Sequence, residues 1–473
     1  MFFLDFFTEV NIIIIVYRKA GKQMSRKVNF RMLPIILALA WPTMLEQLMQ
    51  TAVQYIDTAM VGSLGTDAVA AVGSTTTVNW LVGSSVSALG VGFIAFISQS
   101  LGAGEKDLAV RASSQSVLAT LVSGLFFTVV TLAVSPAVPA LMQVDENIRE
   151  TASHYFFILY TPMIFRAATI IFGSVLRAAG DSKTPMLVGF TVNIINVALN
   201  FLLIYPVRTI AIFGKTITVY GADMGVIGAA AASAIAFAAG GILITFALFA
   251  HKKIAPRKAF LRPDREILKP CLRVALPNML QRFGTSFGYV VFASMINSLG
   301  EISTAAHTVA NTVESAFYIP GYGMQTAAAT LMGNAHGAKD KEKAKDISRL
   351  LIFIEVSLMI ISGGLLFIFA EKMAGLFSDS NEVISLCATV LRMVALSEPF
   401  YGVSLIIEGM LQGIGNTKTP FIFNIVGMWG IRIAGTFICI RLMSMGLISA
   451  WACMIFHNLM LFTAFTVYHK KKY

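Results

Sequence analysis

Hydrophobic residues fill most of this chain in long runs that short polar segments separate. Each run has about twenty residues or more, the length that an α-helix needs to cross the roughly 30 Å apolar core of a bilayer. The pattern therefore predicts an all-α polytopic membrane protein. Twelve transmembrane helices are expected, at residues 33–62, 68–100, 108–136, 150–178, 185–207, 223–250, 267–297, 302–335, 346–371, 384–413, 418–441 and 444–468.

The second half of the chain repeats the first with a constant offset of 235 residues. Matching segments are 41–45 and 276–280, 63–65 and 298–300, 102–103 and 337–338, and 176–185 and 411–420. We therefore expect two pseudo-symmetric six-helix lobes, an N-lobe at 31–251 and a C-lobe at 267–473, joined by a basic cytoplasmic linker at 252–266. Duplicated membrane modules place a substrate path at the repeat interface and rock one half against the other, which indicates a transporter.

Composition supports a membrane protein and excludes a soluble one. Hydrophobic residues make up 56% of the chain, charged residues only 13%, and the mean hydropathy is +0.74, whereas soluble domains carry about 25% charged residues. The net charge of +11 comes from Lys and Arg clustered in alternate loops, as the positive-inside rule describes. We expect a multi-pass protein of the inner (plasma) membrane with both termini cytoplasmic. No basic stripe carries interleaved aromatic residues, so no nucleic-acid partner is expected.

The chain offers no pattern for catalysis or for a cofactor. Its four cysteines and six histidines lack the spacing of a metal site, and neither a phosphate-binding loop nor a nucleophile–base arrangement occurs. We expect no enzymatic activity and no metal. Residues 1–30 are expected to form an N-terminal cytoplasmic or interfacial extension, although Met24 is the favoured start of translation because it leads directly into the first span.

The first span carries a stripe of polar side chains. Thr43, Gln47, Gln50, Gln54 and Asp57 are spaced by 4, 3, 4 and 3 residues, which places them on one helix face. Helix–helix hydrogen bonding explains one or two glutamines in a span. It explains an aspartate poorly, because an ionisable residue at that depth is costly and usually faces a cavity or a partner. We therefore favour a functional role for Asp57.

Two other spans carry polar stripes. The fifth has Asn193, Asn196 and Asn200, and the eighth has His307, Asn311, Glu314, Tyr318 and Gln325. Glu314 could titrate, or it could pair structurally with Arg282 or Arg432. We interpret Asp57, Asn196, Asn200 and Glu314 as cation-coupling residues, and Gln47, Gln50, Gln54, Asn193, Asn311 and Tyr318 as lining the substrate cavity.

Other acidic residues lie within or near later spans, namely Glu355, Glu398 and Glu408. For most of them we expect buried ion pairs that fix packing. The available partners are Arg166, Arg392 and Arg432. Glu398 precedes Pro399, which predicts a break in the tenth span.

Several segments together resemble the multidrug and toxic compound extrusion (MATE) family. They are the run from Asp57 to Gly65 with Pro42 and Gln50 upstream, the run from Leu176 to Pro185, and residues 320–324, 333–338 and 429–432. The likeness covers about residues 30–470. It implies two six-helix lobes around a V-shaped central cavity, and export of organic cations driven by H⁺ or Na⁺.

The resemblance also implies roles for single residues. Asp57 matches the family's coupling aspartate and Asn196 a span 5 asparagine, while Asn200 stands where many relatives carry a second acid. Thr285 stands where one branch has a Na⁺-binding glutamate, which argues against that branch's site. Glu314 matches a span 8 acid of some bacterial members.

The function that follows is a secondary active multidrug antiporter that exports cationic or amphipathic drugs by alternating access. Its partners would be small organic cations, H⁺ or possibly Na⁺ as the coupling ion, and the lipid bilayer, and we expect a monomer. The alternative within the same superfamily is a lipid-linked precursor flippase, which usually has more basic residues facing its cavity. A channel accounts for the hydrophobicity but not for a duplicated module with buried carboxylates.

Overall fold

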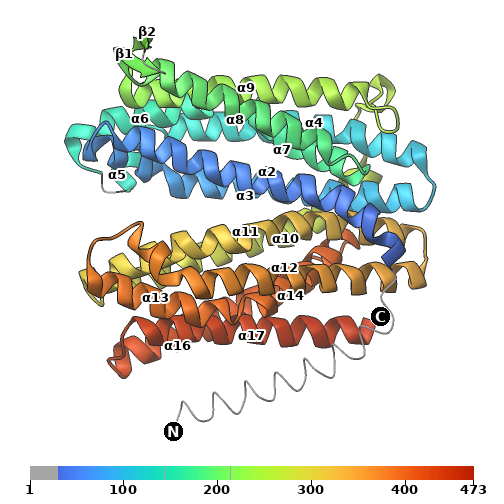
Figure 1. Ribbon diagram of the computed structural model, residues 1–473. Coiled ribbons are helices and arrows are strands. Elements are labelled where there is room, and N and C mark those ends of the chain that lie inside the picture. Colours follow the sequence, from blue (N-terminus) through green and yellow to red (C-terminus); the bar gives the residue numbers. More distant parts are fainter. Residues whose placement is uncertain (1–29, 143, 213–214, 473) are drawn as a thin grey trace.

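The computed structural model describes residues 30–142, 144–212 and 215–472, and it consists of two helical lobes that lie side by side (Figure 1). The expected extension at residues 1–30 therefore lies outside the described residues except for Phe30, where η1 begins. The N-lobe contains η1 (Phe30–Met32), α2 (Leu33–Gly62), α3 (Thr66–Gly102), α4 (Lys106–Val134), α5 (Val138–Leu141), α6 (Glu146–Tyr160), α7 (Met163–Ala178), α8 (Lys183–Leu203), β1 (Pro206–Ile212), β2 (Lys215–Ala222) and α9 (Gly225–Ala250).

The C-lobe follows a linker that contains η2 (Lys258–Phe260). Its helices are α10 (Arg265–Asn297), α11 (Glu301–Gly337), α12 (Lys341–Gly375), α13 (Asn381–Ala395), α14 (Glu398–Gly413), α15 (Lys418–Ile425), η3 (Val426–Ile433), α16 (Ala434–Phe437), η4 (Ile438–Leu442) and α17 (Leu447–Lys472). Separate apolar cores fill the two lobes.

The twelve expected spans correspond to the helices of the structure. Eight helices in the described residues are long and apolar enough to cross a membrane, and two bent pairs raise that number to ten. The remaining two spans are α10 and α11, which are long but carry more polar residues. The all-α, two-lobe prediction is confirmed.

Two spans are broken where proline interrupts the helical hydrogen bonds. The α6–α7 pair bends by 49° at Pro162, and the α13–α14 pair bends by 53° just before Pro399. Proline lacks the amide hydrogen that would continue the helix, and it disfavours helical geometry in the preceding residue. The break expected at Glu398 is confirmed, since α14 begins there.

The eleventh span is less regular than expected. Its α-helical start gives way to π-helical turns at Val426–Ile433 and Ile438–Leu442. Such turns are rare and often occur at functional sites. They widen the helix around Arg432, which lies in the first of them.

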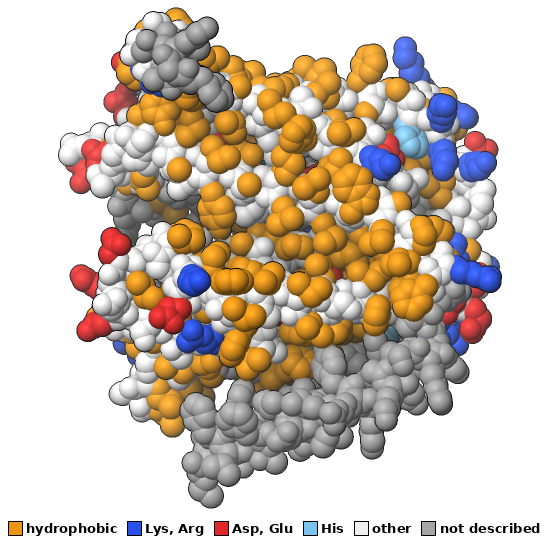
Figure 2. Space-filling view, viewed as in Figure 1, with side chains coloured by type: hydrophobic (Ala, Val, Ile, Leu, Met, Phe, Trp, Pro, Cys, Tyr) orange, Lys and Arg blue, Asp and Glu red, His pale blue; other side chains and the backbone are white. Residues whose placement is uncertain are grey.

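The two ends of the bundle differ in structure and charge. One end carries the antiparallel hairpin of β1 and β2, and we call it the hairpin end. The other carries the linker and the C-terminus, and Figure 2 shows most Lys and Arg side chains of the visible face gathered there, with hydrophobic side chains across the middle. We call it the basic end. The charge pattern predicts that this end faces the cytoplasm.

The lobes pack against each other at the basic end. The start of α2 crosses to the C-lobe, where Ile36, Leu39 and Ala40 join an apolar cluster with α11, α12 and α14. Gln99 of α3 donates from Nε2 to the carbonyl oxygen of Gly413 at 2.8 Å. Thr43 Oγ1 donates to the carbonyl oxygen of Gly323 at 2.9 Å.

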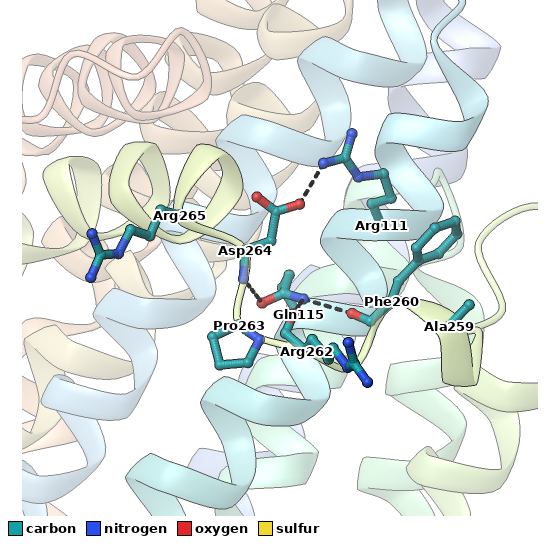
Figure 3. A pocket seen from close by; sticks show the side chains of 8 residues that line it. All are labelled: Arg111, Gln115, Ala259, Phe260, Arg262, Pro263, Asp264 and Arg265. Carbon is teal, nitrogen blue, oxygen red and sulfur yellow. Dashed lines mark hydrogen bonds and ion pairs between the residues drawn. The ribbon is translucent and has the colours of Figure 1, made fainter.

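Buried side chains of α4 fix the linker to the N-lobe, and Gln115 makes most of these contacts (Figure 3). Gln115 Nε2 donates to the carbonyl oxygens of Phe260 and Arg262 at 2.6 and 2.7 Å, and its Oε1 accepts from the Asp264 amide at 3.0 Å. Arg111 forms an ion pair with Asp264 at 2.5 Å. These groups line a pocket of about 440 Å³.

Replacing this anchor should loosen the linker. In Gln115→Ala three linker backbone groups lose their partner, and each costs about 1–3 kcal/mol when buried and unpaired. We expect trypsin to cut within residues 252–265 roughly tenfold faster or more than in the wild-type protein. Gel analysis of the two half-chain fragments measures the rate. Gln50→Ala, at an exposed site on α2, is the control and should leave the rate unchanged; an equal rate in both variants would contradict the anchoring role.

Candidate functional site

Polar side chains come together inside the N-lobe where α2 and α8 approach the hairpin end, and we call this hydrogen-bonded cluster the Asp57 pocket. Asp57 comes from α2, and Asn196 and Asn200 come from successive turns of α8. The Asn200 Nδ2 atom donates to Asp57 Oδ1 at 2.5 Å. Helical spacing of four residues puts both amides on the face that packs against α2.

The Asn196 amide completes the pocket when its nitrogen faces the carboxyl. In that orientation Nδ2 donates to Asp57 Oδ1 at 2.8 Å and lies 3.2 Å from Oδ2, while Oδ1 accepts from the Ser233 hydroxyl of α9 at 3.0 Å. This choice satisfies donors and acceptors on both sides of the amide. Three helices therefore position the Asp57 carboxyl.

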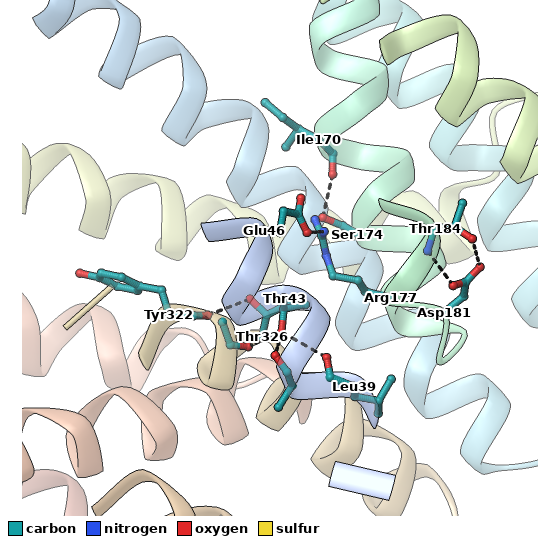
Figure 4. Close-up of polar contacts among 12 residues, drawn as sticks. Leu39, Thr43, Glu46, Ile170, Ser174, Arg177, Asp181, Thr184, Tyr322 and Thr326 are labelled. Carbon is teal, nitrogen blue, oxygen red and sulfur yellow. Dashed lines mark hydrogen bonds and ion pairs between the residues drawn. The ribbon is translucent and has the colours of Figure 1, made fainter. Parts of the chain in front are cut away.

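No basic side chain neutralises Asp57. Among the described residues no Lys, Arg or His lies within 4.0 Å of its carboxyl. A different acid of the same helix, Glu46, does form an ion pair, at 2.8 Å with Arg177 of α7 (Figure 4). Burying an uncompensated carboxylate is unfavourable, so the Asp57 pocket favours a proton or a bound cation.

The other polar side chains predicted on α2 and α8 make no hydrogen bond with Asp57 in the described structure. Gln50 and Gln54 are exposed on α2, and Gln47 is half-buried. The Nδ2 atom of Asn193 is buried without a hydrogen-bond partner in the described structure. The stripe predicted on α2 therefore has polar groups available to a ligand, although the structure does not join them to Asp57.

The C-lobe residues form a second group. Glu314 is buried on α11, while Asn311 of the same helix is exposed. The Tyr318 ring packs edge-on against Tyr322 and Tyr401 at 5.9 and 5.8 Å between centroids. The hydroxyls of those two tyrosines lie 2.9 Å apart.

The expected partners of the buried acids are engaged elsewhere. Arg166 donates to Asn79 Oδ1 at 2.6 Å, Arg392 pairs with Glu371 at 3.2 Å, and the Arg432 guanidinium stacks on Phe292 at 4.2 Å. The expectation of buried ion pairs for Glu355, Glu398 and Glu408 is wrong in the described structure, because these arginines contact amides, aromatic rings or an exposed acid instead.

Glu314 likewise has no ion pair among the described residues. Arg282 donates to Asn278 Oδ1 at 3.0 Å, and the Arg432 guanidinium lies over the rings of Tyr289 and Phe292. The structural pairing considered for Glu314 is therefore not formed.

Sequence reasoning missed several polar contacts. The sequence patterns did not indicate the ion pair of Glu46 with Arg177, the contact of Asn79 with Arg166, or the partner Ser233. Glu46 and Arg177 did carry a usable signal, because both are ionisable residues within spans. Ser233 gave none, because a serine on a helix usually bonds to its own backbone.

The comparisons with known proteins agree with this architecture. The sequence profile of the MatE family matches twice, at residues 42–202 and 277–438, in the same register as the internal repeat. The probable multidrug resistance protein NorM of Thermotoga maritima is 27% identical over 89% of this chain and 88% of its own. The multidrug resistance protein MdtK of Proteus mirabilis is 26% identical over 84% and 85%.

Solved structures show the same fold. One of them is a multidrug resistance MATE family transporter of the MOP superfamily in an outward-facing conformation. It superposes with a TM-score of 0.85 at 24% identity, over 95% of this chain and 97% of that one. A MOP superfamily transporter from Pyrococcus furiosus gives the same TM-score at 23% identity, with the same coverage.

Fold and repeat define a polytopic membrane transporter of two pseudo-symmetric lobes, and not an enzyme. The profile covers well over half of the residues, so the chain belongs to the MatE family, the multidrug and toxic compound extrusion transporters.

Proposed function

We propose that this protein exports cationic or amphipathic small molecules in exchange for H⁺, or for Na⁺, by alternating access. The observation that carries the proposal is the half-buried Asp57 carboxyl, which two asparagines orient and no basic residue neutralises. Relatives named as multidrug resistance proteins support the substrate class. We further propose a monomer in the inner membrane with the basic end facing the cytoplasm.

Competition for one carboxylate is sufficient to couple the two fluxes. Ionised Asp57 attracts an organic cation from the cytoplasmic side. A proton or Na⁺ arriving from outside neutralises the carboxylate, which removes the attraction and releases the drug. Because the empty ionised pocket is costly to bury, the lobes would return only with a ligand bound. The ion gradient then drives export.

The donor set favours H⁺ over Na⁺. No group of three His, Cys, Asp or Glu side chains in the described residues is arranged to hold a metal ion. A proton needs a single carboxyl oxygen, whereas a metal cation needs several oxygen ligands, which here would have to come from the amides of Asn196 and Asn200.

Gradient-driven efflux tests the proposal directly. The purified protein is reconstituted in proteoliposomes, and these are loaded with ethidium. A pH gradient and a Na⁺ gradient are then imposed separately, with protein-free liposomes as the control. We expect efflux with the pH gradient. A response to Na⁺ alone keeps the antiporter and assigns the ion to Na⁺. If no gradient moves any of several cationic dyes, drug antiport is wrong and lipid-linked precursors become the substrates to assay.

A further inference from the structure

Two cysteine side chains meet between the last two spans of the C-lobe. Cys439 lies in η4 and Cys453 in α17, and their Sγ atoms are 3.8 Å apart, which is van der Waals contact for sulfur. Both residues are partly exposed, whereas Cys271 and Cys387 are buried in the separate cores of the two lobes. The fold therefore brings one pair of thiols together and keeps the other two cysteines apart.

A glycine of the eleventh span lets the second thiol reach the first. Gly435 of α16 precedes Cys439 by about one helical turn, so the two residues share a face. A Cβ atom at Gly435 would lie 3.1 Å from Cys453 Sγ and 3.6 Å from Cys453 Cβ. Because glycine presents only backbone there, α17 packs closely against α16, and Cys453 contacts the face that carries Cys439.

The turn between the two spans also restrains the pair. The Met445 amide donates to the Cys439 carbonyl oxygen at 2.9 Å, and Ser444 has a left-handed φ of 52°. The turn thus folds back onto the residue that carries the first thiol. Closing so short a loop costs little chain entropy. The sulfur atoms need to approach by less than about 2 Å to reach the bond length of a disulfide, about 2.05 Å.

The pair lies at the hairpin end of the bundle. The eleventh span ends at Leu442 and α17 begins at Leu447, while the other end of α17 lies at the basic end (Figure 1). With 26 residues, α17 is about 39 Å long, more than the roughly 30 Å apolar core of a bilayer. Both cysteines are within two turns of these helix ends, and residues 441–446 beside them are exposed. An oxidant on that side of the membrane can therefore reach the pair.

We infer that Cys439 and Cys453 are a modification site, a thiol pair that an oxidant on the outer side of the membrane converts into a disulfide. The oxidant is itself a disulfide, either of a small thiol or of a thiol–disulfide oxidoreductase. The inference rests on the proposed function only for the orientation that places the hairpin end outside, where disulfides form and persist.

The reaction is two successive thiol–disulfide exchanges. One cysteine thiolate attacks the oxidant's S–S bond, which forms a mixed disulfide and expels one thiol. The second cysteine thiolate then attacks the mixed disulfide and expels the other thiol. Two S–H bonds of the protein become one S–S bond, and the S–S bond of the oxidant becomes two S–H bonds. Protons and electrons therefore balance without any further reactant.

The disulfide would constrain the irregular outer end of the eleventh span. A π-helical turn holds an extra residue, and rewinding it into an α-helix rotates the residues that follow by roughly 100° about the helix axis. A bond from Cys439 to α17 resists that rotation at η4. Oxidation should therefore slow amide hydrogen exchange in residues 438–442 several-fold, and dithiothreitol should reverse the effect. Equal exchange in both states would contradict this constraint.

Peptide mapping of the full-length protein tests the site. Trypsin cuts after Arg432, Arg441 and Lys470, which places the two cysteines in different peptides, 433–441 and 442–470. The purified protein is treated with glutathione buffers of increasing oxidised fraction, quenched with acid and digested without reductant. We expect a mass equal to that of the two peptides joined, which dithiothreitol separates. Absence of this mass in every buffer would overturn the thiol pair.

Four serine variants show which cysteines react. Cys439→Ser and Cys453→Ser should never give the joined mass, because each retains only one thiol of the pair. Cys271→Ser and Cys387→Ser are the matched controls at the buried cysteines, and they should give the joined mass like the wild-type protein. A joined mass that requires Cys271 or Cys387 would contradict the assignment.

The state of the pair in cells tests where the oxidant acts. Intact cells are quenched with acid and their free thiols are then blocked with N-ethylmaleimide. We expect joined peptides without any added oxidant. Peptides that glutathione joins in the purified protein but that are separate in cells would overturn oxidation from the outer side. Neither result depends on transport, so a failure of gradient-driven efflux would reject antiport and leave the disulfide in place.

Discussion

Asp57→Asn should reduce ethidium efflux under a pH gradient to the level of protein-free liposomes. Asparagine has nearly the same shape as aspartate, and its Oδ1 atom can still accept the hydrogen bond from Asn200, so we expect the fold to survive. The substitution removes the single negative charge of the pocket. The variant can then neither attract an organic cation nor exchange it for a proton.

Ethidium binding and ethidium efflux should be measured together, because the two measurements distinguish a variant that cannot bind the dye from one that binds it but cannot move it. We expect Asp57→Asn to lose affinity for ethidium as well as efflux, whereas a variant that merely moves poorly would still bind the dye. Asp67→Asn, at an exposed residue in the first turn of α3, is the matched control and should keep both activities. Undiminished efflux by Asp57→Asn under a proton gradient would rule out the mechanism.

The fold could be predicted because the signals that specify it are long. Span length, the repeat with its 235-residue offset and the asymmetry of basic loops each involve many residues, so local irregularities do not disturb them. The π-helical turns around Arg432 escaped prediction. Such turns have no preferred residue type that would mark them in a sequence.

The site was only partly predictable. Helical spacing placed Asn196 and Asn200 on one face, and the structure brings both to Asp57. Spacing carries no information about which residues of different helices meet. For that reason the buried acids of the C-lobe were assigned arginine partners that in fact contact Asn79, Glu371 and aromatic rings.

The two lobes share a fold, but equivalent positions of the repeat carry different side chains. Residues 235 apart occupy equivalent positions, and Asp57 corresponds to Phe292, on which Arg432 stacks. The ion pair of Glu46 and Arg177 corresponds to Gln281 and Gln412. The backbone was thus duplicated while the charged residues were placed at different positions in the two lobes.

Where the lobes meet, equivalent residues of the two repeats make equivalent contacts. Gly102 and Gly337 are equivalent residues near the basic ends of α3 and α11. A Cβ at Gly102 would lie 2.0 Å from the carbonyl oxygen of Asn334, and one at Gly337 would lie 2.0 Å from that of Gln99. Each glycine therefore lets its helix touch the backbone of the other lobe.

Gly102→Ala should open the basic end. Alanine favours the helix by about 1 kcal/mol over glycine, so each lobe stays folded, but its methyl group cannot fit against backbone. Overpacking costs about 1–3 kcal/mol, which shifts a two-state equilibrium roughly 5- to 150-fold. We expect the closed contact at this end to lose population by that factor, and gradient-driven efflux to fall with it.

A native cysteine reports the opening. Cys271 of α10 is buried against α3, and a Cβ at Gly92 would lie 2.4 Å from its carbonyl oxygen. With the other three cysteines replaced by serine, the rate of maleimide labelling at Cys271 should rise in Gly102→Ala and in Gly337→Ala. Gly73→Ala on the same α3 helix meets nothing within 4 Å and should label like the parent protein. Equal labelling in all variants would show that the glycine contact does not hold this end closed, and the lobes would then have to close through the α2–α11 contacts instead.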